Sequence, residues 1–277
     1  EQTEFLCTKF SKHKKIDGTK IQKEDIEFLL KDAKKQVTQN DNAQSIVHIF
    51  NHNYIVDGKS FIEEPINIYA NSLSHEMTFV TAPKNNLKNI KEVFIDCDIE
   101  VERFISSTFA LGAELLSEDQ LEMGSILIDL GFEKTSLGLF KNLALIHSTT
   151  LPLGINHMVK DISKVCSLNL EDSEIIKNNI DYSFIDNANM FDENNYLKEN
   201  YLKNSNLKKL SKSLISNILQ ARLDEILEMI KKQTSSTSLS FGNNIFITGG
   251  GSQLTKIDTY FSNFLKKNVK KLNGKNK

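Results

Sequence analysis

A short apolar segment near the middle of the sequence ends in an aspartate and a glycine, two residue types that can hold a cation and a phosphate. Residues 124–140 read GSILIDLGFEKTSLGLF, with Asp129 at the end of the apolar run and Gly131 two positions later. A carboxylate there can hold a hydrated cation, and a glycine lets backbone N–H groups approach a phosphate. Because Asp-x-Gly also closes many ordinary β-hairpins, the motif alone predicts a hairpin and leaves the ligand open.

A second segment ends in a turn without side chains. Residues 244–254 read NIFITGGGSQL, a β-branched and aromatic strand followed by Gly249, Gly250 and Gly251. A flat ring or a phosphate can lie against such a turn, and a helix is expected to begin at Ser252. If one ligand uses both segments, the acidic turn and the glycine turn must meet. We expect them to face each other across a cleft between two lobes.

The composition is that of a globular protein and narrows the possible functions. The chain has 277 residues and a formal net charge of −2, and it is 39% hydrophobic and 25% charged. Dedicated nucleic-acid binders carry a strong basic excess, so no nucleic acid is expected as a partner. No apolar run approaches the roughly 20 residues that span a bilayer. Three widely spaced cysteines outside any C-x-x-C pair fit reduced thiols of the cytoplasm.

The beginning of the chain has the pattern of a small α/β unit. Residues 22–37 have the apolar spacing of an amphipathic helix, and strands are expected on both sides of the turn at Asp57-Gly58. His48 and His52 fall in the first of these strands, where a spacing of four does not bring two side chains onto one metal. This unit shows no catalytic pattern, so contact with another protein is its expected role.

Residues 74–122 alternate between strand and helix patterns, which predicts a mainly parallel, covered sheet. The expected strands are 75–81 and 99–105, and the second expected helix is 106–116. The first expected helix begins near Pro83 and has a predicted buried face made of Leu87, Ile90, Val93 and Phe94.

After the central hairpin the patterns become mostly helical. The expected elements are a strand over 144–150, a helix from Ile155, an acidic helix start at 170–177, a loop-rich segment at 178–203 and a long helix over 206–233. The long helix carries two neighbouring apolar stripes, a width typical of a helix that covers a sheet. One stripe holds Leu207, Leu210, Leu214 and Ile218, and the other holds Ile215, Leu219, Leu223, Ile226 and Ile230.

The order of these segments resembles the FtsA family, the actin-like bacterial division proteins that tether FtsZ filaments to the membrane. Four stretches carry the resemblance: the helix 23–37 with its strands, the hairpin 124–140, the run from LPLGINHMVKDI to LEDSEIIK at 151–177, and residues 213–254. The resemblance implies an α/β, actin-like (ribonuclease H-like) ATPase fold with two lobes and the inserted subdomain 1C of this family. It also implies that the chain is shorter than the family at both ends.

The same resemblance implies a division of the chain into subdomains and a set of partners. The implied parts are 1–73 as subdomain 1C, 74–122 as part of 1A, 123–175 as the first part of 2A, 176–240 as 2B, and 241–277 as a return to 2A. In the family, 1C takes part in self-association into filaments and in contacts with later division proteins, and 2B faces the carboxy-terminal peptide of FtsZ. The implied location is the cytoplasmic face of the inner membrane, reached through parts of the full-length protein that this chain lacks.

A site for ATP and Mg²⁺ is also implied by the resemblance. Asp129 and Gly131 match the phosphate loop, with Asp129 reaching Mg²⁺ through water, and Gly154 lies where another turn approaches the phosphates. The remaining matches are Glu174 and Lys177 on the helix that contacts ribose and base, and Gly249, Gly250 and Gly251 in the adenosine loop.

The phosphate loop departs from the family pattern Asp-x-Gly-Gly-Gly-Thr. This chain has Phe132, Glu133 and Lys134 between Gly131 and Thr135. Phe132 adds bulk, and a carboxylate about 5 Å from a phosphate oxygen would cost about 3 kcal/mol at an effective dielectric of about 20. Lys134 is expected to offset part of that charge. These residues predict weakened or remodelled phosphate binding and at most weak ATPase activity.

Other functions remain open at this point. A pilus-assembly relative such as PilM, or a rod-shape protein such as MreB, would share the fold, although MreB lacks the 1C-type unit. A sugar or acetate kinase of the same superfamily would need a general base beside its acceptor, and Asp129 is the only candidate. A scaffold with a degenerate nucleotide site is a further possibility, and Phe132 and Glu133 favour it.

Overall fold

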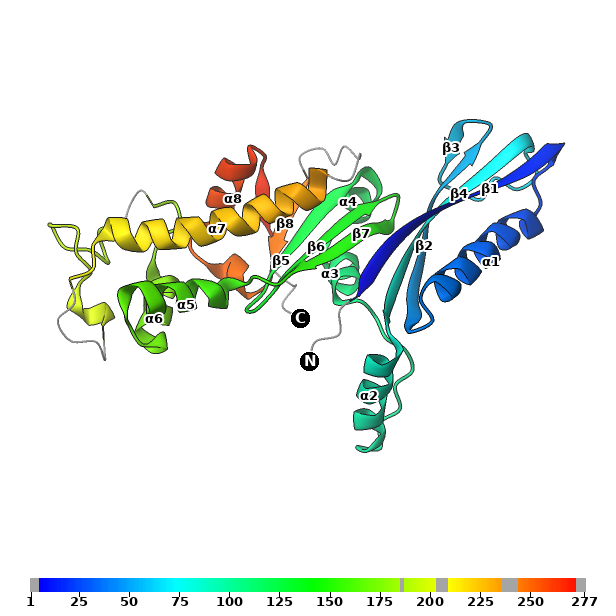
Figure 1. The fold of residues 1–277 in the computed structure, drawn as a ribbon. Helices are drawn as coiled ribbons and strands as arrows, with labels where there is room; N and C mark the ends of the chain where they lie inside the picture. Colours follow the sequence, from blue (N-terminus) through cyan, green and yellow to red (C-terminus); the bar gives the residue numbers. More distant parts are fainter. Residues whose placement is uncertain (1–4, 185–186, 203–208, 236–243, 273–277) are drawn as a thin grey trace. The chain divides into compact units, whose positions relative to one another are not determined.

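The computed structural model describes residues 5–184, 187–202, 209–235 and 244–272 (Figure 1). The chain divides into two compact units. The first unit contains Glu1–Ser125 and Gly138–Thr149, and the second contains Ile126–Leu137 and Thr150–Lys277.

The first unit is built on a four-stranded antiparallel sheet with one helix against it. The sheet order is β1 (Leu6–Lys20), β4 (Tyr69–Pro83), β2 (Gln44–Val56) and β3 (Lys59–Phe61), and helix α1 (Lys23–Asn40) packs on the sheet. Side chains of α1 that recur every three or four residues face the strands and are buried: Ile26, Leu29 and Ala33. The expected helix and the strands around Asp57-Gly58 are therefore confirmed.

Strand β4 is longer than the sequence pattern predicts and pairs on both sides. It runs antiparallel to β1, with Leu73 opposite Lys14 and Thr81 opposite Leu6, and antiparallel to β2. The expected subdomain boundary at residue 73 lies inside this strand. The prediction of a mainly parallel sheet over 74–122 is wrong, because β4 belongs to the antiparallel sheet and residues 99–105 form no strand.

Three helices follow β4 in the first unit. They are α2 (Lys84–Ile95), α3 (Ser107–Leu115) and α4 (Glu118–Met123). Helix α2 begins after Pro83 as expected, but none of its residues is buried, and the side chain of Val93 is 64% exposed. The predicted buried face of α2 is therefore wrong. Its apolar spacing is helical, but the structure buries none of its side chains.

The second sheet has five strands in the order β7-β6-β5-β8-β9. These strands are β5 (Ser125–Leu130), β6 (Thr135–Lys141), β7 (Ala144–Leu151), β8 (Ile245–Thr248) and β9 (Val269–Lys271). Strand β8 lies parallel to both β5 and β9. The expected hairpin strands, the strand after them and the strand before the glycine turn are all confirmed.

Apart from its strand residues, the described part of the second unit is mostly helical. Its helices are α5 (Ile155–Cys166), α6 (Leu170–Asn179), α7 (Lys212–Ser235), α8 (Ile257–Leu265) and the short 3₁₀ turns η1 (Glu199–Tyr201) and η2 (Gly250–Gln253). The stripe of α7 that contains Leu219 and Leu223 is buried, whereas Leu214 of the other stripe is exposed. The glycine turn leads into η2, so the expected helix start at Ser252 is wrong, and α8 begins only at Ile257.

Helix α7 begins later than the apolar stripes predict. Residues 203–208 lie outside the described chain, residues 209–211 are not helical, and the helix starts at Lys212. Across the described ranges, none of the helices is both long and apolar enough to cross a membrane.

Candidate functional site

The acidic turn and the glycine turn meet at the ends of two adjacent parallel strands. The register of β5 and β8 places Asp129 opposite Thr248, the last residue before the glycines. Because parallel strands end at the same edge of a sheet, Asp129 and Gly249 emerge side by side. Both turns belong to the second unit, so the expectation that they face each other across a cleft between two lobes is wrong.

The three glycines of the second turn have different surroundings. Gly249 has φ of 85° and ψ of 175°, and a β-carbon there would overlap Asp129 Oδ1 and lie 2.8 Å from the carbonyl oxygen of Leu130. A β-carbon on Gly251 would lie 2.5 Å from Leu130 Cγ. Gly250 has no atom within 4 Å of its β-carbon position and faces open space. The turn therefore needs glycine for packing at two positions and presents bare backbone at the third.

Asp129 carries a carboxylate with little solvation. Partial burial raises the pKa of Asp129 above its usual value. Within residues 5–272, leaving aside the gaps at 185–186, 203–208 and 236–243, no group donates a hydrogen bond to this carboxylate. A cation or its bound water would stabilise the ionised form, so the residue fits the expected magnesium role.

A metal ion at Asp129 would depend on ligands besides protein carboxylates. The described part of the chain contains no group of three His, Cys, Asp or Glu side chains that could hold a metal ion. His48, one of the two histidines four apart, instead accepts a hydrogen bond on Nε2 from the backbone N–H of Ser106 at 3.0 Å. An ion at Asp129 would therefore need ligands from outside these described side chains.

Gly131 and Gly154 lie where the acidic turn contacts the start of α5. The backbone N–H of Ile155 donates to the carbonyl of Gly131 at 3.0 Å, and that of Asn156 donates to Phe132 at 2.8 Å. A β-carbon on Gly154 would lie 2.6 Å from the Gly131 carbonyl oxygen. The structure therefore brings Asp129, Gly131, Gly154 and the glycine turn together through direct backbone contacts.

The unusual residues of the loop are held by α5. Asn156 Nδ2 donates to Glu133 Oε1 at 2.5 Å, and Lys160 Nζ lies 3.3 Å from the same oxygen. The hydrogen bond from Asn156 is the main reason that the pKa of Glu133 is lowered, and Lys160 adds to it. The charge that Lys134 was expected to offset is therefore paired with Lys160. The Phe132 side chain is 56% exposed.

Glu174 and Lys177 form an ion pair on α6. Lys177 Nζ lies 3.6 Å from Glu174 Oε1, and the Lys177 side chain is only 3% exposed. Tyr182 connects this helix with the segment after the glycine turn: its hydroxyl donates to the Lys177 carbonyl at 2.9 Å, and its backbone N–H donates to Thr255 at 2.9 Å. Tyr182 therefore links the helix that carries both residues to Thr255, four positions after Gly251.

The sequence patterns did not predict three residues of this arrangement. Asn156 and Lys160 bind the loop from α5, and Tyr182 joins α6 to the glycine-turn segment. The spacing of Asn156 and Lys160, one helical turn apart, is a weak signal that becomes useful only after Glu133 is placed beside α5. Tyr182 lies in an aperiodic segment and gives no signal.

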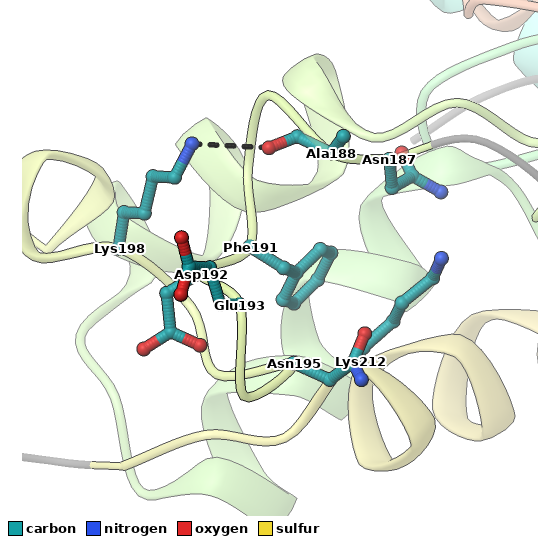
Figure 2. A pocket seen from close by; sticks show the side chains of 8 residues that line it. All are labelled: Asn187, Ala188, Phe191, Asp192, Glu193, Asn195, Lys198 and Lys212. Carbon is teal, nitrogen blue, oxygen red and sulfur yellow. Dashed lines mark hydrogen bonds between the residues drawn. The ribbon is translucent and has the colours of Figure 1, made fainter.

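A separate hollow lies in the segment between α6 and α7. It is lined by Asn187, Ala188, Phe191, Asp192, Glu193, Asn195, Lys198 and Lys212, which Figure 2 shows around the Phe191 ring. Lys198 Nζ donates to the carbonyl oxygens of Ala188 and Asn189, both at 3.0 Å. This hollow has mixed charge and shares no residue with the two turns.

The fold is actin-like. The chain superposes with a TM-score of 0.61 on a structure titled "PilM-PilN type IV pilus biogenesis complex", at 13% identity, covering 98% of this chain and 66% of that one. It superposes with a TM-score of 0.57 on MreB5 of Spiroplasma citri bound to ADP, at 20% identity, covering 69% and 61%. These similarities confirm the expected fold class.

Sequence comparisons show which of the families with this fold the chain resembles in sequence. Cell division protein FtsA of Agrobacterium fabrum is 27% identical over 257 residues, which are 92% of this chain and 58% of that protein. FtsA of Bacillus subtilis is 26% identical over 255 residues, 92% and 57% of the two chains. The chain thus spans a little more than half the length of these relatives.

Family models agree with the relatives over both units. The model described as "SHS2 domain inserted in FTSA" matches residues 5–81, and that described as "Cell division protein FtsA" matches residues 126–275, more than half of the chain. The chain belongs to the FtsA family of bacterial cell division proteins.

Proposed function

We propose that this chain supplies the adenosine side and one phosphate loop of an ATP-binding site in an actin-like division protein. The observation that carries the proposal is the meeting of Asp129 with Gly249, because it joins an acidic turn to bare backbone at one sheet edge. The MreB5 structures similar to this chain are titled as bound to ADP and AMPPNP, which supports a nucleotide for this fold.

Each turn has a proposed role in that site. Asp129 would hold Mg²⁺ through water, and the backbone of Gly131 and Gly154 would approach the phosphates. The open face of Gly250, between Gly249 and Gly251, would lie against the adenosine. Glu174 and Lys177 would contact ribose and base from α6.

The proposed role of the nucleotide is to stabilise an assembly-competent arrangement of the protein, with turnover secondary. A hydrolase or kinase needs a general base near the reacting phosphate or acceptor. Asp129 is the candidate general base in the two turns, but its proposed role is to hold the cation, so it would not be available to accept a proton.

The subdomain roles are also part of the proposal. Subdomain 1C would comprise the four-stranded sheet with α1 and would end with β4 at Pro83, since that strand pairs with β1 and β2 along its length. It would serve self-association and contacts with later division proteins. Residues 176–240 would form subdomain 2B and face the FtsZ carboxy-terminal peptide, and the hollow around Phe191 supplies a surface there. The protein would act on the cytoplasmic face of the inner membrane.

Calorimetric titration with ATP and Mg²⁺ tests the nucleotide proposal. The protein should be expressed from its complete gene, alongside Asp129→Ala and a control variant, Asp119→Ala, which changes an exposed acid on α4. We expect Asp129→Ala to lose at least tenfold in magnesium-dependent affinity while the control binds as the wild type does. Equal affinity in all three proteins would remove Asp129 from the site, and no binding by any of them would favour a scaffold with a degenerate site.

The partner proposal has its own test. A fluorescently labelled FtsZ carboxy-terminal peptide is titrated with the same protein and with Phe191→Ala, and polarisation is measured. Binding that weakens in the variant supports the hollow as part of the FtsZ-facing surface. A peptide that does not bind the wild-type protein would contradict the partner assignment.

A further inference from the structure

We propose that Glu133 makes this site prefer nucleoside diphosphates over triphosphates, and that Lys160 is the positioning residue that holds the Glu133 carboxylate. The inference rests on the proposed nucleotide site, in which the loop after Asp129 approaches the terminal phosphates. It assigns a role to Glu133, one of the three residues that stand between Gly131 and Thr135 where the family pattern has two glycines.

The loop that carries Glu133 is held in one conformation by backbone hydrogen bonds. Gly131 N–H donates to the Lys134 carbonyl at 3.1 Å, which closes the turn on itself. The first amides of α5 donate to the carbonyls of Gly131 and Phe132. Glu133 therefore lies in a loop that is attached to α5 through the carbonyls of Gly131 and Phe132.

The carboxylate of Glu133 is ionised and only partly neutralised. Its pKa is lowered chiefly by the hydrogen bond from Asn156, so it carries a full charge at neutral pH. Lys160 Nζ lies 3.3 and 3.4 Å from the two carboxylate oxygens, longer than the roughly 2.7–2.9 Å of strong charged hydrogen bonds. Both side chains are about half exposed, so the ion pair is weak, and the carboxylate can repel an anion that lies closer to it than to Lys160.

The remaining charge acts more strongly on a triphosphate than on a diphosphate. A third phosphate adds negative charge at the end of the ligand that lies nearest the loop, and like charges repel at short range. The adenosine side of the site is unaffected, because its glycines lie on the other turn. The ratio of ATP to ADP affinity is therefore the quantity that Glu133 controls.

Titrations with ADP and ATP, both with Mg²⁺, test this assignment in the protein expressed from its complete gene. In Glu133→Gln, which keeps an acceptor for Asn156, we expect the affinity ratio to move about tenfold toward ATP, with the ADP affinity changing less than about threefold. In Lys160→Ala the ratio should move the other way. If Lys160 acts only through Glu133, the double variant should equal Glu133→Gln, as a double-mutant cycle would show.

The control is Glu225→Gln, which removes another ion-paired carboxylate, the partner of Arg222 on α7. Its ratio should match the wild type, and thermal unfolding should show that all variants remain folded. An unchanged ratio in Glu133→Gln, with both nucleotides still bound, would overturn the inference and leave the proposed function standing. A wild-type protein that binds neither nucleotide would overturn both. A further loss of ATP affinity when Lys160→Ala is added to Glu133→Gln would show direct phosphate contact by Lys160 and refute the positioning role.

Discussion

Alanine at position 249 is expected to destabilise the second unit, because a β-carbon there has no space where β5 and β8 end. Gly249 has φ of 85° and ψ of 175°, a conformation that costs other residues roughly 1–3 kcal/mol. The new β-carbon would also overlap Asp129 Oδ1 and approach the Leu130 carbonyl oxygen to 2.8 Å. Relieving such an overlap typically costs about 1–3 kcal/mol.

The two costs together predict a loss of about 4 kcal/mol in the free energy of unfolding. For a unit of this size each kcal/mol lowers the melting temperature by about 2–4 °C, so the expected shift is about 8–16 °C. Gly250→Ala is the matched control, since its β-carbon would meet no atom within 4 Å. Thermal unfolding followed by circular dichroism measures both variants against the wild type.

The same pair of variants separates stability from binding. Gly250→Ala should melt within about 1 °C of the wild type, yet lose nucleotide affinity, because its methyl group would occupy the surface proposed for adenosine. A Gly249→Ala protein that melts with the wild type would refute the argument from conformation and overlap. A Gly250→Ala protein that binds nucleotide normally would refute the placement of adenosine on that face.

Three further changes test other parts of the structure. Burial lowers the pKa of His75 to about 4, so the neutral side chain contributes its full stability above pH 6.5, and this contribution is lost as the pH falls toward 4. Urea titrations should show that the free energy of unfolding drops by about 2 kcal/mol between pH 7.5 and 5 because of His75. In His75→Phe the drop over the same pH range should be smaller by about 2 kcal/mol. Arg222→Met breaks the hydrogen bonds of 2.7 and 2.9 Å to Asp161 that join α7 to α5. The free energy of unfolding, measured by the same assay, should fall by about 1–2 kcal/mol, and Arg222→Lys should restore only part of this stability. Tyr182→Phe removes a buried hydroxyl bonded to α6; a cost of about 1 kcal/mol is expected, with weaker binding of ATP but unchanged binding of inorganic triphosphate.

Elements defined by local patterns could be predicted from the sequence. The apolar run before Asp129 and the β-branched run before Gly249 are both strands, and the spacing of Ile26, Leu29 and Ala33 identifies the buried face of α1. Each of these signals lies within a few consecutive residues, where strand and helix periods differ most clearly.

Predictions that depended on distant partners failed. The apolar face of α2 has helical spacing, but spacing does not say what covers the face, and Val93 is exposed. Strand β4 has the local pattern of a βαβ unit, whereas its pairing with β1 and β2 is decided by residues at least 17 positions away.

The candidate site also contains a part that the sequence predicted and a part that it did not. The two turns were expected to face each other across a cleft between lobes, whereas the parallel pairing of β5 and β8 places Asp129 and Gly249 at one sheet edge of the second unit. The attachment of Glu133 to Asn156 and Lys160 could not be predicted, since it depends on how α5 starts against the loop.

The register of β1 against β4 brings the two ends of the four-stranded sheet close together in space. Leu6 at its entry and Thr81 near its exit are directly opposed in the ladder, so the chain arrives and departs at neighbouring points. Paired residues in antiparallel strands have Cα atoms only about 4.5–5.5 Å apart. The four-stranded sheet and α1 can therefore be inserted into or removed from one surface turn of another protein without moving the two ends of that turn apart.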